Sequence, residues 1–259
     1  MLRKVNCFSV SCLLALSLFN SQAISSEQAA VAEQSENSSS TESPKMTVLT
    51  PFNAKYKVSK GRLNLGSAKR QLSQIGENRF TFSYFSDLSF LILSDHRRET
   101  SELTINEGNV TPIRYLFKRE GTGSDKSTTL SFTDGQILDS EENAKIEAAE
   151  NIHWYDEISY QLQMKMDLAA GKTEMKYYLI DHKKRDKLYH FKVVAEEIIE
   201  VPAGKINTVK LQRIRPGDDR LTEFWLAPDL GYLLVRIRQE RDGSEVADAQ
   251  LEKYVFTPM

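Results

Sequence analysis

Apolar and polar residues alternate along many short segments of this chain between positions 52 and 256. In the segment 52–58 every second residue is apolar, and the pattern recurs at 79–84 and 128–132. Successive side chains of a β-strand point to opposite faces, so the pattern predicts extended segments with one buried face. Further segments of this kind are 113–117, 174–180, 188–194, 206–214, 223–226, 232–237 and 251–256.

Turn signals separate many of these segments. Asp134-Gly135 and Asp242-Gly243 lie between alternating runs, and an Asp-Gly pair in that position favours a tight hairpin. Ten or more strands joined by short turns predict a mainly β fold. We expect an antiparallel meander that forms a barrel or half-barrel, because curling protects the sheet edges.

One segment has a different period. Apolar residues recur at helical spacing between Trp154 and Leu168. Asp156 or Asn151 is placed to cap the start of this segment, and Gly171 follows its end. The sequence therefore predicts one amphipathic α-helix that crosses a sheet face or plugs one end of the barrel.

The N-terminus has the layout of a secretory signal. Arg3 and Lys4 precede an apolar stretch at 5–19, and Ser21-Gln22-Ala23 offers small residues for cleavage. We predict a signal peptide at 1–23, cleaved near Ala23, and a periplasmic location. An uncleaved anchor is the alternative, although the apolar stretch is shorter than the roughly 20 residues of a membrane span.

Both cysteines, Cys7 and Cys12, lie within this signal. The mature chain is therefore expected to have no disulfide and no thiolate chemistry. Lipidation of Cys12 is disfavoured, because an apolar run follows it.

Residues 24–50 are rich in Ser, Glu and Gln and contain no aromatic residue, which predicts a disordered linker. The predicted domain is 51–259.

Charge and motifs exclude several kinds of chemistry. The net charge of −2 does not call for a nucleic-acid partner. The four histidines are not paired at the spacing of a zinc helix, and no phosphate-binding or nucleophile motif is present. We therefore expect no metal, no cofactor and no catalytic residue set. Ser159 beside Asp156 is interpreted as a helix cap.

The order of several short motifs resembles that of an exported bacterial family, the domain of unknown function 3108, across most of 52–256. The motifs are Phe-x-Ala-x-Tyr-x-Val at 52–58, Gly-x-Val-x-Pro at 108–112, Asp-x-x-Ser at 156–159, Gly-Lys-Ile at 204–206 and Trp-Leu-Ala-Pro-Asp at 225–229, followed by Tyr232. Leu234 stands where we expect proline. The resemblance implies an exported β-rich domain without an established activity.

A second, more distant likeness concerns the fold. The strand ending from Trp225 to Tyr232 is similar to envelope lipid carriers, in which a curved sheet surrounds a helix; this is an analogy of fold. The run Phe80 to Leu93 is apolar on both faces near its end, which indicates either core packing or a groove for a hydrophobic ligand. The predicted ligand-binding residues are Phe85, Phe90, Leu91, Ile92, Arg97, Arg98, Trp225 and Tyr232.

The leading hypothesis is a non-enzymatic periplasmic protein that binds a lipid, a glycan or an envelope partner protein, with no transmembrane span in the mature chain. One alternative is a glycan-acting hydrolase that uses a carboxylate pair. The sequence selects no pair among its candidates, which are Glu99, Glu102, Asp156, Glu157, Glu223 and Asp229. Another alternative is a structural component of an envelope complex.

Overall fold

The structure is a computed structural model that describes residues 46–90, 92–133 and 135–257, except for the side chain of Phe90. The predicted signal peptide and most of the predicted linker lie outside the described residues. The strands are β1 (Phe52–Lys60), β2 (Leu63–Gln74), β3 (Arg79–Phe90), β4 (Leu93–Asn106), β5 (Asn109–Gly121), β6 (Lys126–Thr133), β7 (Gln136–Asp139), β8 (Ala144–Ile146), β9 (Trp154–Tyr155), β10 (Glu174–Ile180), β11 (Asp186–Val201), β12 (Gly204–Ile214), β13 (Arg220–Ala227), β14 (Leu233–Arg241) and β15 (Ser244–Phe256). The helices are α1 (Ser159–Ala169) and the 3₁₀ turn η1 (Pro228–Leu230).

All the strands belong to one 15-stranded sheet whose order is β8-β7-β6-β5-β4-β3-β2-β1-β15-β14-β13-β12-β11-β10-β9. Strands that follow one another in the chain are paired antiparallel, with two exceptions: β9 and β10 pair parallel, and β8 and β9 are not paired with each other. The first and last long strands, β1 and β15, lie side by side. The sheet is open, with β8 and β9 at its edges, so the predicted antiparallel meander is confirmed in its half-barrel form.

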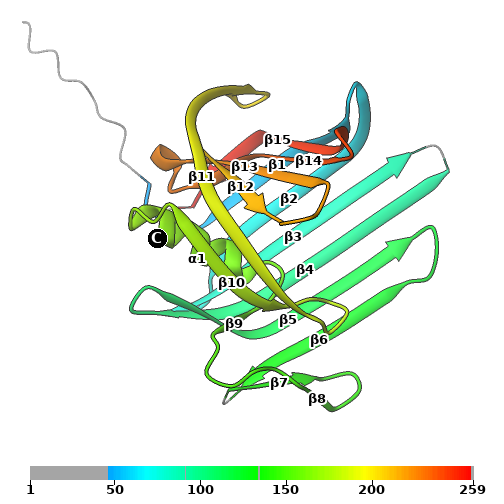
Figure 1. The fold of residues 1–259 in the computed structure, drawn as a ribbon, viewed down its shortest axis with the longest axis vertical. Coiled ribbons are helices and arrows are strands. Elements are labelled where there is room, and N and C mark those ends of the chain that lie inside the picture. Colours follow the sequence, from blue (N-terminus) through cyan, green and yellow to red (C-terminus); the bar gives the residue numbers. More distant parts are fainter. Residues whose placement is uncertain (1–45, 91, 134, 258–259) are drawn as a thin grey trace, which may run out of the picture. The chain divides into compact units, whose positions relative to one another are not determined.

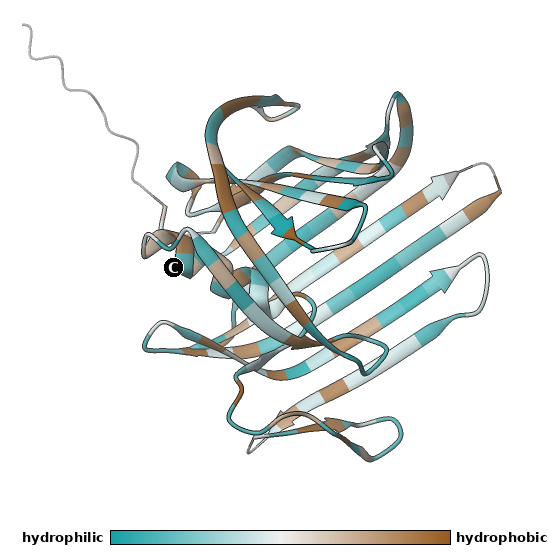
Figure 2. Ribbon diagram, viewed as in Figure 1, coloured by the Kyte–Doolittle hydropathy of each residue, from teal (hydrophilic) through white to brown (hydrophobic). Residues whose placement is uncertain are grey.

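Alternation along the strands places the core on the concave face of this sheet. In β1 the side chains of Phe52, Ala54, Tyr56 and Val58 are buried, whereas those between them are exposed. Figure 2 shows the same change of hydropathy from residue to residue along many strands. One buried face on each strand accounts for the curl, because only a curved sheet brings these faces together around a single core.

The curled sheet surrounds α1. The long strand β11 crosses in front of the β1–β5 part of the sheet, and α1 lies beside β10 (Figure 1). The helix contacts β5 and β10, and the side-chain amide of Gln163 accepts a hydrogen bond from the backbone N–H of Val110 at 2.8 Å. No helix among the described residues is long and apolar enough to cross a bilayer.

The helix differs from the prediction in two respects. It begins at Ser159, because Trp154 and Tyr155 form β9 and pair with β10. It is also buried on nearly every side rather than amphipathic, and its polar side chains are paired inside the protein. For example, Lys165 Nζ donates to the carbonyl oxygen of Val48 at 2.9 Å.

The N-cap position of α1 is Ile158, which makes no side-chain capping bond; the predicted Asp156 instead binds the turn that leads into the helix. The Oδ1 atom of Asp156 accepts hydrogen bonds from the backbone N–H groups of Ile158 at 2.9 Å and Ser159 at 2.8 Å. In return, Ser159 Oγ accepts a bond from the N–H of Asp156 at 3.0 Å. This reciprocal arrangement fixes the turn that leads into α1. At the other end, Gly171 adopts a φ of 82° that closes the helix.

Candidate functional site

A cavity of about 440 Å³ lies between the concave face of the sheet and the first turn of α1. Volumes of this order are typical of small-molecule sites. Strands β1 to β4 line one side, and β11 to β15 line the other. The helix supplies Tyr160 and Gln161 to the cavity lining, and Ile158 just before it also contributes. The cavity is therefore bounded by elements far apart in the sequence.

Much of the cavity wall is apolar or aromatic. Leu88, Phe224, Leu234 and Ile237 come from β3, β13 and β14. Four tyrosines, Tyr56, Tyr84, Tyr160 and Tyr189, add rings with a polar tip. Aromatic and aliphatic walls with a few polar groups are the usual lining of ligand pockets.

Charged side chains occupy inward positions that a simple core would fill with apolar residues. Four arginines line the cavity: Arg70 of β2, Arg97 of β4, Arg213 of β12 and Arg215 just after β12. Arg70 donates a hydrogen bond to Gln161 of the helix, and its guanidinium lies 5.7 Å from the ring centroid of Tyr84.

Three carboxyl groups share the cavity with these arginines: Asp95, Glu99 and Glu157. Asp95 is bound by two arginines, with Arg97 Nε 2.8 Å from Oδ1 and Arg119 Nε 2.9 Å from Oδ2. These two guanidinium groups hold the pKa of Asp95 below its usual value despite partial burial. Asp95 is therefore a fixed negative charge.

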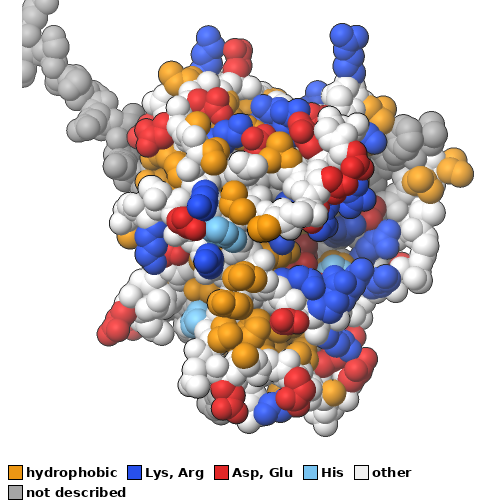
Figure 3. Space-filling view, in the orientation of Figure 1, with side chains coloured by type: hydrophobic (Ala, Val, Ile, Leu, Met, Phe, Trp, Pro, Cys, Tyr) orange, Lys and Arg blue, Asp and Glu red, His pale blue; other side chains and the backbone are white. Residues whose placement is uncertain are grey.

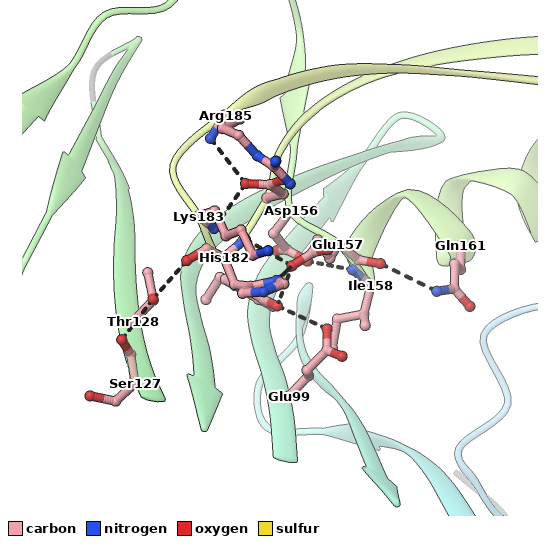
Figure 4. A network of polar contacts seen from close by, with 12 residues as sticks. Glu99, Ser127, Thr128, Asp156, Glu157, Ile158, Gln161, His182, Lys183 and Arg185 are labelled. Carbon is pink, nitrogen blue, oxygen red and sulfur yellow. Dashed lines mark hydrogen bonds and ion pairs between the residues drawn. The ribbon is translucent and has the colours of Figure 1, made fainter. Parts of the chain in front are cut away.

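Glu99 and Glu157 meet at one phenol. Tyr115 Oη lies 2.8 Å from Glu99 Oε2 and 3.2 Å from Glu157 Oε2. Glu157 Oε2 also accepts bonds from the backbone N–H of His182 at 2.8 Å and from its Nδ1 at 2.6 Å. Figure 4 shows Glu99, Glu157 and His182 converging beside the start of α1.

Burial and the nearby charge of Glu157 raise the pKa of Glu99 to about 7. A phenol carries one proton, so Tyr115 donates to only one of the two carboxyl groups at a time. A proton on Glu99 supplies the second hydrogen bond. Glu99 thus shares a proton with its neighbours near neutral pH, and Glu157 remains the acceptor for both Tyr115 and His182.

Asp156 extends this polar cluster into the core. Its side chain is fully buried and accepts a hydrogen bond from Ser101 Oγ at 2.6 Å. Burial raises the pKa of Asp156, although the bonds from Ser101 and the helix N–H groups oppose the shift. Asp156 therefore serves as a structural acceptor at the helix start.

The same cluster fastens the β10–β11 turn to the opposite wall. The ring of His182 stacks on Phe117 of β5 with centroids 4.1 Å apart. Its backbone carbonyl oxygen accepts a bond from Thr128 Oγ1 of β6 at 2.8 Å (Figure 4), and Lys184 forms an ion pair with Asp139 of β7. Side chains thus bridge walls that no backbone ladder joins.

The structure distributes the predicted ligand-binding residues over several places. Arg97 lines the cavity. Tyr232 does not line this cavity. It lies in a small adjoining space that is also lined by Tyr56 and Arg70. Phe85 and Arg98 lie together in a depression on the outer face, where the Arg98 guanidinium is 5.1 Å from the Phe85 ring centroid.

Trp225 is also on the outer face, because Phe224 and Leu226 beside it point into the core. It is buried there, and its Nε1 donates to Glu197 at 2.7 Å. Its ring centroid lies 4.8 Å from Lys210 Nζ. These contacts account for the burial of Trp225 without a ligand.

The apolar run at the end of β3 forms a hairpin tip. β3 ends at Phe90 and β4 begins at Leu93, so the chain reverses within this run. Packing of the run in the core was one of the two expectations from the sequence. Ile92 is 93% exposed. Leu91 and the side chain of Phe90 lie outside the described residues. The role of this run in ligand binding stays a prediction.

The structure brings together three of the predicted carboxylates, namely Glu99, Asp156 and Glu157. The others lie elsewhere: Glu102 pairs with Arg79, Glu223 is bound 2.7 Å from Lys210 Nζ, and Asp229 is in η1. Within the described ranges, no three His, Asp or Glu side chains gather as a metal-binding set.

Sequence reasoning missed several cavity residues, although a signal for them exists. Arg70 alternates with the buried Ala68 and Leu72 of β2, and Arg213 continues the alternation of Val209 and Leu211 in β12. A charged residue at an apolar-face position is costly unless it meets a partner or a polar cavity. Such out-of-pattern arginines therefore mark a site.

The outer surface is mixed in charge. Figure 3 shows Lys and Arg interspersed with Asp and Glu over most of the face in view, with a group of basic side chains right of centre. Exposed ion pairs such as Lys55–Glu252, at 2.9 Å, are common on this surface and contribute little to stability. The unusual electrostatics of the protein are thus inside the half-barrel.

An open, barrel-like antiparallel sheet around a helix and a polar cavity defines the class of this protein. The chain belongs to the family described as protein of unknown function (DUF3108), whose profile matches residues 52–250. This confirms the resemblance seen in its motifs. Comparison with curated proteins gives no significant match.

One solved structure supports the fold. A β-barrel-like protein of domain of unknown function DUF1849 from Brucella abortus superposes with a TM-score of 0.54 at 11% identity, covering 82% of this chain and 99% of that chain. A DUF1089 family protein from Pseudomonas aeruginosa matches with a TM-score of 0.39 at 9% identity, covering 65% of this chain and 87% of that one. The first likeness supports a barrel-like fold and nothing about function.

Proposed function

We propose that this chain is an exported envelope protein that binds a lipid or glycan in the half-barrel cavity without transforming it. The observation that carries the proposal is the cavity of about 440 Å³ inside the curved sheet. Its wall combines four tyrosines with aliphatic side chains, which suits a ligand with an apolar or ring-shaped surface. Export is supported by the signal-like sequence at 1–23.

Native mass spectrometry of the protein purified from the periplasm tests ligand binding. We expect a bound mass that solvent extraction removes and that chemical analysis assigns to a lipid or glycan. The substitution Ala249→Phe fills part of the cavity lining, so it should reduce the bound fraction. Ala144→Phe in the exposed edge strand β8 is the matched control. An empty wild-type protein with no affinity for acyl or glycan probes would contradict the proposal.

Export has its own test. Fractionation of cells that produce the full chain should place it in the periplasm, and the intact mass should correspond to cleavage near Ala23. A cytoplasmic protein that keeps residues 1–23 would overturn this part of the proposal. The two tests are independent, because ligand binding does not require export.

A second candidate function, a glycan-acting hydrolase, is favoured by one observation. Glu99 and Glu157 both line the cavity, and the pKa of Glu99 is raised to about 7. A carboxyl group that keeps its proton near neutral pH is suited to general-acid catalysis. Glu157 is held by Tyr115 and His182, however, which favours a structural role for the pair.

Release of new reducing ends from envelope glycans distinguishes this candidate from simple binding. A hydrolase should lose this activity in Glu99→Gln and keep it in Glu102→Gln, whose side chain pairs with Arg79. A wild-type protein that binds glycan and releases no reducing ends excludes the hydrolase.

A further inference from the structure

The four cavity arginines, Arg70, Arg97, Arg213 and Arg215, form what we call the arginine cluster. The charges around it do not balance. Asp95 is already bound by Arg97 and Arg119. No ion pair with a carboxylate of the described residues is formed by Arg70, Arg213 or Arg215. Three cationic groups thus face the cavity without an anionic partner from the part of the chain in view.

The remaining acids near the cluster are engaged elsewhere. Asp218, whose charge acts on Arg215, is bound by Arg220, with Nε 2.8 Å from its Oδ1. Glu157 accepts bonds from Tyr115 and His182. Glu99 has a pKa raised to about 7, so it carries at most part of a negative charge near neutral pH. The interior of the half-barrel therefore has an excess of positive charge, even though the whole chain has a net charge of −2.

Two donors of the cluster are left without a hydrogen-bond partner. The Nε atoms of Arg213 and Arg215 are buried and have no acceptor among the described residues. The Arg213 guanidinium carbon lies 3.3 Å from the ring centroid of Tyr189, and Arg215 Nη1 donates to Thr222 Oγ1 at 2.9 Å. These contacts orient the two guanidinium groups but do not use their full donor capacity.

Burial of such charges is costly unless an anion compensates them. Burial, together with the nearby Arg213 and Arg220, lowers the pKa of Arg215 to about 10. Guanidinium groups form paired hydrogen bonds with phosphate and carboxylate oxygens, which match their planar donors. A ligand oxyanion is the group that the unpartnered donors fit.

Apolar side chains line the same cavity. Leu88, Leu234 and Ile237 lie on the wall together with Phe224 of β13. A small inorganic anion would leave this surface in contact with water, whereas an apolar chain attached to the anion would cover it. The combination of oxyanion-binding donors and an apolar wall defines an amphiphile.

We infer that the cavity binds an anionic amphiphile, with its phosphate or carboxylate held by Arg213 and Arg215 and its apolar body against the wall of β3, β13 and β14. This inference rests on the proposed binding function and names the chemical class of its ligand. Arg70 and Arg97 lie in the same cavity and add to the positive potential around the anion.

Calorimetric titration with four probes tests the inference. Decyl phosphate and decanoate carry an anion on an apolar chain, monodecanoylglycerol is the neutral counterpart, and inorganic phosphate lacks the chain. We expect decyl phosphate or decanoate to bind at least about tenfold more tightly than monodecanoylglycerol and inorganic phosphate. The double variant Arg213→Gln/Arg215→Gln should lose about 10- to 100-fold in affinity for the anionic amphiphile and little for the neutral one.

The control is Arg114→Gln, because Arg114 is an exposed residue of β5 outside the cavity lining. It should bind all probes as the wild type does. If the double variant fails to fold, Arg213→Lys keeps a charge while removing the planar donors, and it should still weaken anionic binding. Circular dichroism reports folding in each case.

The outcomes separate the inference from the proposed function. Equal affinity for charged and neutral amphiphiles would overturn the inference and leave ligand binding in the cavity intact. If inorganic phosphate binds as tightly as decyl phosphate, the apolar chain contributes nothing, and the inferred ligand class is a free anion rather than an amphiphile. A protein that binds no amphiphile and no glycan would overturn both.

Discussion

At the scale of single residues, the protein is distinguished by ionisable side chains inside an otherwise apolar half-barrel. Asp156 and Lys165 are buried and Glu99 is half-buried, and each has a hydrogen-bond partner. Burial disfavours the charged form of each group and so shifts its pKa. These shifts connect the stability of the fold to pH, and two of them can be tested separately.

Glu99→Gln should remove part of the dependence of stability on pH. The folded-state pKa of about 7 lies above the ordinary value of 4.5, so the native state keeps a proton between these values that the unfolded chain releases. The native state binds more protons in this window, and the wild type therefore loses stability as pH rises through it. The loss due to Glu99 is on the order of 3 kcal/mol.

Urea denaturation below and above this pH window measures the effect. Glu99→Gln retains the shape of the protonated acid, so it should match the wild type at acidic pH and exceed its unfolding free energy by roughly 2–3 kcal/mol at alkaline pH. Glu102→Gln is the control and should keep the wild-type slope. An unchanged slope in Glu99→Gln would show that Glu99 titrates normally.

Lys165→Met should have the opposite dependence on pH. Burial and the nearby Arg70 lower the pKa of Lys165 from 10.5 to about 7. The unfolded chain then binds more protons between these values, so stability rises with pH across the window and the cost of the charge is fully present below it. Methionine removes the charge and loses the bond to Val48.

We expect Lys165→Met to raise the unfolding free energy by about 1–3 kcal/mol below neutral pH, and the gain to fade toward pH values above the unfolded pKa. Denaturant midpoints over a pH series measure this difference. Lys176→Met, at an exposed position of β10, provides the comparison and should change stability little. A destabilised Lys165→Met at low pH would refute the prediction.

At the scale of elements, two strands that sequence patterns missed, β2 and β4, line the cavity, whereas the short strands β7, β8 and β9 were missed for lack of length. In β4 the inward positions Asp95, Arg97, Glu99 and Ser101 are polar, so apolar alternation does not appear. Strand β2 has Arg70 at such a position. Strands with clean alternation, such as β1 and β10, were predicted within a few residues of their observed bounds. The weak pattern is a consequence of the site itself.

Packing of β2 against β3 depends on one glycine. Gly66 has a φ of +133°, and a Cβ atom added there would lie 2.1 Å from the carbonyl oxygen of Asp87. Gly61 also has a positive φ, of +56°, but no atom lies within 4 Å of its added Cβ. Comparing substitutions at the two glycines therefore separates the cost in stability of the backbone conformation from that of the steric contact.

Gly66→Ala should lower the unfolding free energy by roughly 2–4 kcal/mol, because the β2–β3 ladder must shift to admit the methyl group. Gly61→Ala is expected to cost about 1 kcal/mol, from its backbone conformation alone. Thermal or urea unfolding of the two variants measures the difference. Equal losses would mean that β3 yields to the methyl group without cost.

At the scale of the whole molecule, the last strand of the chain pairs with β1. Phe52 pairs with Phe256 across β1 and β15, and the backbone N–H of Thr257 donates to the carbonyl oxygen of Pro51 at 2.9 Å. The ends of the domain therefore lie side by side. A domain with adjacent ends tolerates circular permutation when the new ends fall in an exposed turn.

A circular permutant of residues 46–257 should fold when its ends are joined by a short Gly-Ser linker and it is opened between Gly123 and Ser124. That turn between β5 and β6 is exposed. A permutant opened between Tyr56 and Lys57 interrupts β1 at the centre of the sheet and should not fold. Far-ultraviolet circular dichroism and cooperative unfolding measure the outcome. Failure of the first permutant with a soluble wild type would contradict it.

Local patterns in the sequence predicted the strands with apolar alternation, the helix α1 with the Asp156 turn at its start, and the antiparallel meander. These features depend on residues close together in the chain, whose spacing is visible without a structure. The location of β9 and the burial of most of α1 were not visible, because pairing with β10 and packing inside the curl set them.

The site depends on how the sheet curls. Glu99, Tyr115, Glu157 and His182 are separated along the chain by 16 to 42 residues, yet they form one hydrogen-bonded cluster. Arg213 of β12 and Arg70 of β2 line the same cavity, although β1, β15, β14 and β13 separate the two strands in the sheet. The alternation of a strand fixes which side chains point inward, but the direction and extent of the curl fix which of them meet, and that depends on packing summed over the whole sheet.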